Sequence, residues 1–163
     1  MPVIREALPP LFLDKAEDPS MSDCCCPNTS PQTRQICPEC GSTCKRVGMP
    51  TLYHQVRFPE NQVIITDSYY FCPAKTCSIA YFSSAGNTIP KQYLRSYQAI
   101  QNDALCYCFG IDAAQYLSAL NTLHAESIKD FVVQRTKAGE CACEIRNPSG
   151  LCCLANFKRL ENE

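Results

Sequence analysis

Two close pairs of cysteines mark the first half of the sequence, Cys37-Pro-Glu-Cys40-Gly and Cys72-Pro-Ala-Lys-Thr-Cys77. Two thiolates three residues apart can chelate one ion, and the glycine after the second lets the backbone fold under the sulfurs. Two such pairs on either side of a short β-hairpin are typical of a zinc ribbon, in which four thiolates surround a structural Zn(II) ion. The spacing therefore predicts a zinc site at Cys37, Cys40, Cys72 and Cys77.

Two other residues compete for a place in this site. Cys44 follows Cys40 closely, but its use would crowd three ligands on one side and leave the second pair half empty. His54 lies in a strand-like stretch, where a lone histidine is more often a surface or core residue. We rank both behind Cys77.

A second group of cysteines lies in the second half of the chain, at Cys106-Tyr-Cys108, Cys141-Ala-Cys143 and Cys152-Cys153. Pairs separated by one residue suit an iron cluster better than a zinc ribbon. An oxidised [2Fe-2S] core with four thiolates carries a charge of about −2, which amides and dipoles at helix amino termini can compensate. Cys108 precedes an expected helix start at Ile111 and Asp112, and Cys153 falls in the first turn of another expected helix.

Composition favours metals over disulfides as the partners of these sulfurs. Cysteine accounts for 14 of 163 residues, and tryptophan is absent, so the apolar core is thin. The first residues contain no apolar stretch of the kind found in secretory signals, which predicts a cytoplasmic protein with reduced thiols. The alternative is a disulfide-rich secreted domain. No apolar run is long enough to span a membrane, and a net charge of −1 without a basic stripe argues against nucleic-acid binding.

The elements that must position these cysteines divide the chain into three predicted parts. Prolines and polar residues predict a disordered tail over residues 1–35, with Met21 as a second possible start. Extended stretches predict strands at Leu52–Phe58, Val63–Phe71 and Ile79–Phe82, with a turn at Pro59–Gln62. Helical spacing follows a linker near residues 85–100, with helices from Asp112, over Ser127–Lys137 and from Leu151. We expect an α+β fold, with a zinc ribbon at 36–90 and a helical [2Fe-2S]-binding domain at 91–163.

The second cysteine group and its flanking motif resemble a known family. The run Cys143-Glu-Ile-Arg-Asn147-Pro148-Ser149-Gly150-Leu-Cys152-Cys153, after Cys106-x-Cys108, resembles the [2Fe-2S] domain of bacterioferritin-associated ferredoxins. It resembles more closely the amino-terminal region of CopZ-type copper chaperones, in which a zinc ribbon precedes that domain. The resemblance covers about residues 36–157 and implies zinc at the four cysteines named first. It implies cluster ligation by Cys106, Cys108, Cys143 and Cys153, while Cys141 or Cys152 could substitute within the last two pairs.

The remaining cysteines decide between functions. Up to Glu163 the sequence has no Met-x-Cys-x-x-Cys motif of the heavy-metal-associated domain that these chaperones carry, so we expect that domain to be lacking. Cys24, Cys25 and Cys26 form a soft triplet that would favour Cu(I), although a merely reactive tail is equally compatible with it.

The resemblance implies a metallochaperone-like protein that handles copper or another thiophilic ion, with the cluster as one-electron donor. It would exchange metal or electrons with a protein partner. The alternatives are a small ferredoxin-like electron carrier without metal cargo, and a transcriptional or scaffold zinc ribbon without a cluster. No hydrolase triad or phosphate loop is present, so any enzymatic activity would be metal-ion reduction through the cluster.

Overall fold

The computed structural model describes residues 34–122 and 124–162. In the first half of this part, five antiparallel strands form one sheet in chain order, β1-β2-β3-β4-β5. The strands are β1 (Arg34–Ile36), β2 (Thr43–Val47), β3 (Tyr69–Phe71), β4 (Ile79–Ser83) and β5 (Thr88–Pro90). The helices that accompany the sheet are α1 (Met49–Gln55), η1 (Glu60–Val63), η2 (Lys91–Tyr93) and α2 (Tyr97–Gln101).

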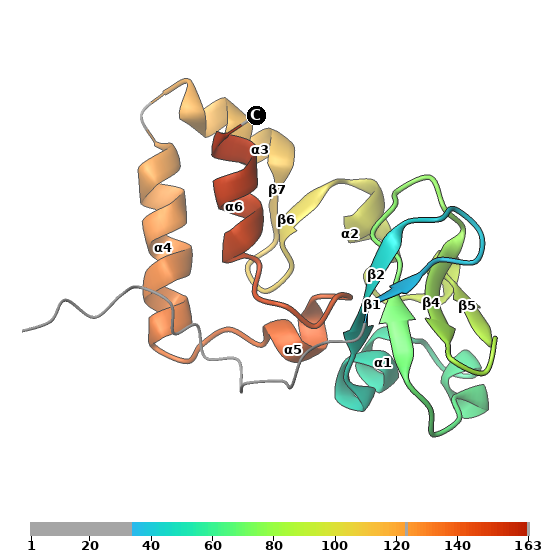
Figure 1. Cartoon of the computed structure of the whole chain (residues 1–163). Helices are drawn as coiled ribbons and strands as arrows, with labels where there is room; N and C mark the ends of the chain where they lie inside the picture. Colours follow the sequence, from blue (N-terminus) through green and yellow to red (C-terminus); the bar gives the residue numbers. More distant parts are fainter. Residues whose placement is uncertain (1–33, 123, 163) are drawn as a thin grey trace, which may run out of the picture.

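The second half is mainly helical. A two-stranded ribbon of β6 (Ala104–Cys106) and β7 (Ile111–Asp112) leads into the helices α3 (Ala113–Leu120), α4 (Ala125–Lys137), α5 (Cys143–Arg146) and α6 (Leu154–Glu161). Figure 1 shows α3, α4 and α6 on one side of the molecule and the sheet on the other, with α1 and α5 side by side between them. The predicted α+β class is confirmed, and the division into two domains stays a prediction.

The predicted strand at Leu52–Phe58 is wrong, because most of it belongs to helix α1. Pro50 lies in the first turn, where its fixed φ suits a helix start and its missing N–H leaves no helical bond unmade. Leu52, Gln55 and Val56 are buried, which is the spacing of a helical face. The strand predicted at Val63–Phe71 is also mostly wrong, since only Tyr69–Phe71 pairs in the sheet and residues 60–63 form a 3-10 turn.

Two boundaries of the predicted parts also differ in the structure. Residues 34–36, expected as tail or at its edge, form strand β1, which pairs with Thr43–Lys45 of β2. The expected linker near 85–100 contains β5, η2 and the start of α2, and it is joined to α1 by a bridge between Val56 and Leu94. The two halves are therefore connected by ordered structure.

Strand β4 organises the core because all five of its residues are buried. Alternate side chains point to opposite faces of a strand. On one face, Phe82 stacks on Tyr70 with ring centroids 5.5 Å apart, close to the first cysteine group. On the other face, Tyr81 packs with Leu52, Val56 and other apolar residues of the main core.

The helical predictions hold better. Asp112 caps α3 as expected: its carboxylate accepts from the Gln115 amide at 2.7 Å, and the Gln115 side chain accepts from the Asp112 amide. Helix α4 ends before Gly139, whose positive φ of 71° is the usual stop signal. The predicted apolar face of α3 is only partly buried, since Tyr116 packs against Phe157 of α6 while Leu117 and Leu120 are exposed.

None of the helices in the described residues has the length and apolar character needed to cross a bilayer.

Candidate metal centres

The four cysteines predicted to bind zinc come together in the structure. The sulfurs of Cys37, Cys40, Cys72 and Cys77 all lie within 4.8 Å of one another. Cys37 and Cys77 are 3.8 Å apart, and Cys40 and Cys72 are 3.5 Å apart. A tetrahedron with metal–sulfur bonds of about 2.3 Å has edges of about 3.8 Å, so the four sulfurs fit one Zn(II) ion.

Two turns present these sulfurs. Cys37 follows β1, and the turn is closed by its amide, which donates to the Ser42 carbonyl at 2.8 Å. Gly41, with φ of +72°, donates its amide to the Cys37 carbonyl. Cys72 directly follows β3, and the turn to Cys77 is closed by the Cys77 amide, which donates to Ala74. Both turns therefore sit at ends of sheet strands, as a zinc ribbon requires.

Sequence reasoning missed two side chains that hold these turns. Glu39, inside the first turn, accepts from the Ser78 hydroxyl at 2.7 Å and from the Ser78 amide at 3.2 Å, next to Cys77 in the second turn. Lys91 is almost fully buried, and its ammonium donates to the carbonyls of Ala74 and Lys75. Glu39 is found between the first two cysteines in the sequence, but nothing there indicates its partner.

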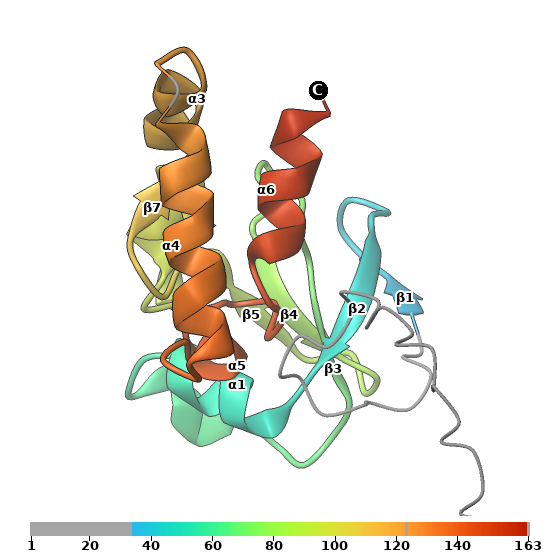
Figure 2. The same ribbon diagram turned by 90° about the vertical axis from the view of Figure 1, so that its left-hand side faces the viewer.

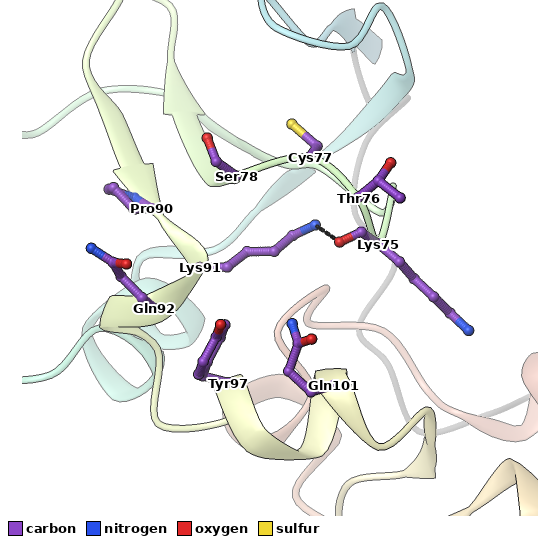
Figure 3. A pocket seen from close by; sticks show the side chains of 9 residues that line it. All are labelled: Lys75, Thr76, Cys77, Ser78, Pro90, Lys91, Gln92, Tyr97 and Gln101. Atoms are coloured by element: carbon purple, nitrogen blue, oxygen red, sulfur yellow. Dashed lines mark hydrogen bonds between the residues drawn. The ribbon is translucent and has the colours of Figure 1, made fainter.

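Lys91 also lines a polar hollow of about 460 Å³ beside the second turn (Figure 3). Its stem runs under the loop that carries Cys77, and its head points at the carbonyl of Lys75. The remaining lining residues come from the same loop, from β5 and η2 and from α2: Lys75, Thr76, Cys77, Ser78, Pro90, Gln92, Tyr97 and Gln101. A buried cation thus lies next to a site whose four thiolates would leave bound zinc with excess negative charge.

Three of the sulfurs differ in their pKa. Hydrogen bonding with Ser42 lowers the pKa of the exposed Cys40 to about 6, which favours its thiolate. Burial raises the pKa of Cys72 and of Cys77, so a metal cation is needed to hold these sulfurs as anions.

The two competing residues stay outside the group of four. Cys44 is fully buried among the aromatic residues of this core, and its thiol donates to the Ser42 carbonyl at 3.3 Å. Burial raises the pKa of Cys44 to about 11, which favours a neutral thiol. His54 lies exposed on helix α1.

The closest sulfur contacts of the second cysteine group fall into two pairs, and Cys143 and Cys153 also interact across them. Cys153 donates its thiol to Cys106 at 3.1 Å, and the sulfurs of Cys108 and Cys143 are 3.5 Å apart. Among the described residues, only the first group brings three or more such ligands within 4.8 Å of one another. A [2Fe-2S] cluster takes two thiolates on each of two irons, so a ligand set split into two close pairs fits it better than a single ion.

Four separate elements supply these pairs. Cys106 ends β6, Cys108 lies in the turn before β7, Cys143 begins α5, and Cys153 is the residue before α6. Cys106, Cys143 and Cys153 are buried in the core between the helices, and Cys108 is partly buried. The Ala142 amide donates to the Cys108 sulfur at 3.3 Å, the kind of bond that stabilises a sulfur anion.

Protonation of the second group follows the same pairing. The hydrogen bond from Cys153 lowers the pKa of Cys106, and the same bond raises the pKa of Cys153. Thiolate ligation of a metal would displace the protons of both sulfurs.

The two leftover cysteines of this region lie at its edge. Cys141 and Cys152 are partly buried and pack against the same core, and Cys152 also interacts with Cys143. The triplet Cys24, Cys25 and Cys26 lies outside the described residues.

Comparison with known proteins adds a family match for the first group. Residues 34–95 match the family model zf_CopZ, described as a zinc binding domain. This range contains all four sulfurs of the first group together with β1 to β5, α1 and η2. Zinc binding by this part of the chain is thus supported by the family match and by the geometry of the sulfurs.

Similarity to one protein extends further along the chain. The copper chaperone CopZ of Archaeoglobus fulgidus is 29% identical over 129 residues, which cover 76% of this chain and 60% of that protein. The X-ray structure of the N-terminal domain of that CopZ superposes with a TM-score of 0.61 at 27% identity, covering 78% of this chain and 98% of the domain. The chain thus spans about three fifths of the length of this curated relative.

Proposed function

We propose that this protein is a metallochaperone-like metal-handling protein with a structural zinc at Cys37, Cys40, Cys72 and Cys77 and a [2Fe-2S] cluster at Cys106, Cys108, Cys143 and Cys153. The observation that carries the proposal is the contrast between the two sulfur groups: one compact set of four and one set of two pairs. Similarity to a copper chaperone over 76% of the chain supports the metal-handling role.

The second site has the properties that a redox cluster needs. When bound, a [2Fe-2S] cluster accepts and donates single electrons. The chain holds the two sulfur pairs in an apolar core, where Phe157 and Val132 are fully buried and limit the access of water. Limited water access and amide bonds such as that from Ala142 are the features by which a protein sets such a potential.

The metal that is handled is proposed to be Cu(I) or another thiophilic ion. Soft thiolates select Cu(I) over harder cations. Six cysteines are not used by the two proposed centres, namely Cys24, Cys25, Cys26, Cys44, Cys141 and Cys152. Of these, Cys44 is fully enclosed in the first core, which leaves the triplet and the two cysteines beside the second group as candidate acceptors.

Anaerobic purification with metal analysis tests the metal content. We expect about one zinc and two irons per chain, with visible absorption from the cluster. A colourless protein with zinc alone would overturn the cluster assignment and leave a zinc-ribbon scaffold.

Anaerobic Cu(I) titration against a thiol competitor tests the metal cargo. We expect binding tighter than to glutathione, and weaker binding when Cys24, Cys25 and Cys26 are replaced by serine. Binding no tighter than to glutathione, with a reversible one-electron couple retained, would show the alternative function of an electron carrier without cargo.

A further inference from the structure

The segment between Cys143 and Cys153 is attached to the sheet half of the molecule by three side chains. Thr51 Oγ1 donates to the Glu144 carbonyl at 2.6 Å. Gln55 Nε2 donates to the carbonyls of Ile145 and Arg146 at 2.9 and 2.8 Å. Tyr81 Oη donates to the Pro148 carbonyl at 2.6 Å. All four acceptors are backbone carbonyls of residues 144–148, so these bonds fix the course of the chain.

These bonds replace partners that helix α5 cannot supply. A helix leaves its last four carbonyls without partners inside the helix, and α5 has only four residues. Helix α1 lies beside α5 in both views of the molecule, and its side chains reach these carbonyls (Figures 1 and 2). Thr51, Gln55 and Tyr81 are at most 3% exposed, so a side chain of the same shape without the polar group leaves little room for water to replace the lost donor.

The amide of Gln55 is oriented for this role. The Ser96 hydroxyl donates to Gln55 Oε1 at 2.6 Å in a buried contact. Because the oxygen of the amide is used by Ser96, its nitrogen faces the two carbonyls of α5. Ser96 itself follows Arg95, whose amide donates to the Gln55 carbonyl, so α1 is held on two sides.

The loop between α5 and Cys153 is also held in place, by its own hydrogen bonds and by contact with Thr51. Buried Asn147 accepts from the amide and the hydroxyl of Ser149 and donates to the Leu151 carbonyl at 2.7 Å. The loop also lies directly on Thr51: a Cβ atom at Gly150 would come within 2.9 Å of Thr51 Oγ1. Gly150 has φ of +69°, which a side chain would strain as well.

We infer that Thr51, Gln55 and Tyr81 are positioning residues for the second metal centre, which they hold through Cys143 and Cys153. These two cysteines complete one pair each, with Cys108 and Cys106. Helix α1 and strand β4 belong to residues 34–95, the part of the chain that matches a zinc binding domain. The second site therefore takes its geometry from this part, the zinc half, only when the zinc half is folded. The inference rests on the proposed function for the identity of the metal, and on the structure alone for the placement of the thiols.

Three conservative variants of the full chain test it. Tyr81→Phe removes one buried donor and keeps the ring, and Thr51→Val does the same at α1, whereas Thr51→Ser keeps the hydroxyl. Tyr53→Phe, exposed on the same helix, is the matched control. For Tyr81→Phe and Thr51→Val we expect iron release to a chelator to be faster by roughly tenfold, because a carbonyl of the segment loses its side-chain donor. The midpoint potential should shift, while zinc content and the behaviour of Thr51→Ser and Tyr53→Phe stay as in the wild type.

A second readout does not need iron. In zinc-loaded, iron-free protein, the alkylation rates of Cys143 and Cys153 report how firmly the segment is held, because both thiols are buried. We expect faster alkylation in Tyr81→Phe and Thr51→Val than in the wild type. If the wild type binds no iron but the alkylation rates differ, the cluster is wrong and the positioning role stands. Unchanged alkylation, iron release and potential in a variant that combines Tyr81→Phe with Thr51→Val, with zinc intact, would overturn the positioning role.

Discussion

The two cysteine groups are built in opposite ways. The first draws its four sulfurs from two short turns at the ends of neighbouring strands, and all four lie within 4.8 Å of one another. The second draws its pairs from three places along the chain: Cys106 and Cys108 before α3, Cys143 at the start of α5 and Cys153 before α6. Its members meet only when the helical half is folded. A compact set of local pairs can organise a small domain by itself, whereas a dispersed set depends on structure already formed.

The two groups also differ in their contacts with the other half of the chain. Side chains of α1 and β4 donate to the segment that carries Cys143 and Cys153. Within the described residues, the bonds that close the first group come from the sheet half itself, from Ser42, Ser78 and Lys91. The zinc half is therefore expected to hold its metal without the second centre, and the second centre is expected to fail without the first.

Removing a ligand of the first group is expected to have the largest effect. Cys72→Ser takes away a fully buried sulfur, and because zinc binding energy is folding energy in small domains, the sheet half should unfold. Iron should be lost together with zinc. Metal analysis and circular dichroism measure both.

Cys44→Ala is the matched control for that variant. Cys44 is equally buried in the same core but lies outside the group of four, so one zinc per chain should remain bound. Loss of zinc in Cys44→Ala with zinc retained in Cys72→Ser would exchange the roles of these two cysteines.

Removing a ligand of the second group should have a smaller effect, which is limited to the second centre. In Cys153→Ser we expect iron to be lost while the zinc content and the unfolding of the sheet half stay unchanged. Cys152→Ser, the neighbouring variant, should keep its iron, because it is the sulfur of Cys153 that donates to Cys106. Retention of iron by Cys153→Ser and loss by Cys152→Ser would assign Cys152 as the ligand.

The cysteine pairs could be read from the sequence because ligand spacing is local. Cys37 and Cys40 or Cys106 and Cys108 are neighbours whatever the fold, and a turn is enough to present them. The contacts of Thr51 and Gln55 with α5 join residues about 90 positions apart, with 93 between Thr51 and Glu144. No local pattern encodes such a pair.

Helix α1 shows how tertiary packing overrides residue preference. Tyr53, Val56 and Phe58 favour strands, which is why a strand was predicted there. In the structure, Leu52 and Val56 are buried in the main core, and Gln55 on the same helix is buried against α5. Pro50 was the available signal for a helix start. The capped helix α3 was predictable because its signal, Asp112 followed by Gln115, is local.

Replacing Lys91, whose buried ammonium lies beside the first group, is a milder test of that group. Lys91→Met keeps most of the apolar stem but leaves the Lys75 carbonyl without the Lys91 donor and the Ala74 carbonyl with the Cys77 amide alone. We expect zinc to remain bound and its release to a chelator to accelerate by roughly tenfold, since the loop that ends at Cys77 loses its support. Lys75→Met, whose ammonium is exposed and paired with Asp103, is the control and should leave zinc release unchanged. Equal rates in both variants would remove Lys91 from the zinc site.

The smallest effect is expected for the contacts of Glu161, a charged side chain that joins three helices of the second half. Glu161 at the end of α6 accepts from Lys129 of α4 at 2.8 Å and from Tyr116 of α3 at 2.6 Å. These two bonds, that from Lys129 first, lower the pKa of Glu161 below its usual value of 4.5. Because the pKa of Glu161 is lower in the folded protein, the carboxylate stabilises the fold at pH values above 4.5. This stabilisation is lost as the pH falls through the pKa of the folded protein.

Glu161→Gln therefore should cost about 1 kcal/mol or less at neutral pH, because the ion pair is partly exposed. Amide hydrogen exchange of α6 in the zinc-loaded wild type and variant measures the difference. The variant should exchange faster at pH 7, and the difference should shrink as the pH approaches and passes below 4.5. Iron and zinc contents should not change at neutral pH, because Glu161 contacts neither cysteine group through any bond recorded among the described residues. An equal difference at neutral and acid pH would show that packing of the side chain, and not its charge, holds the three helices together.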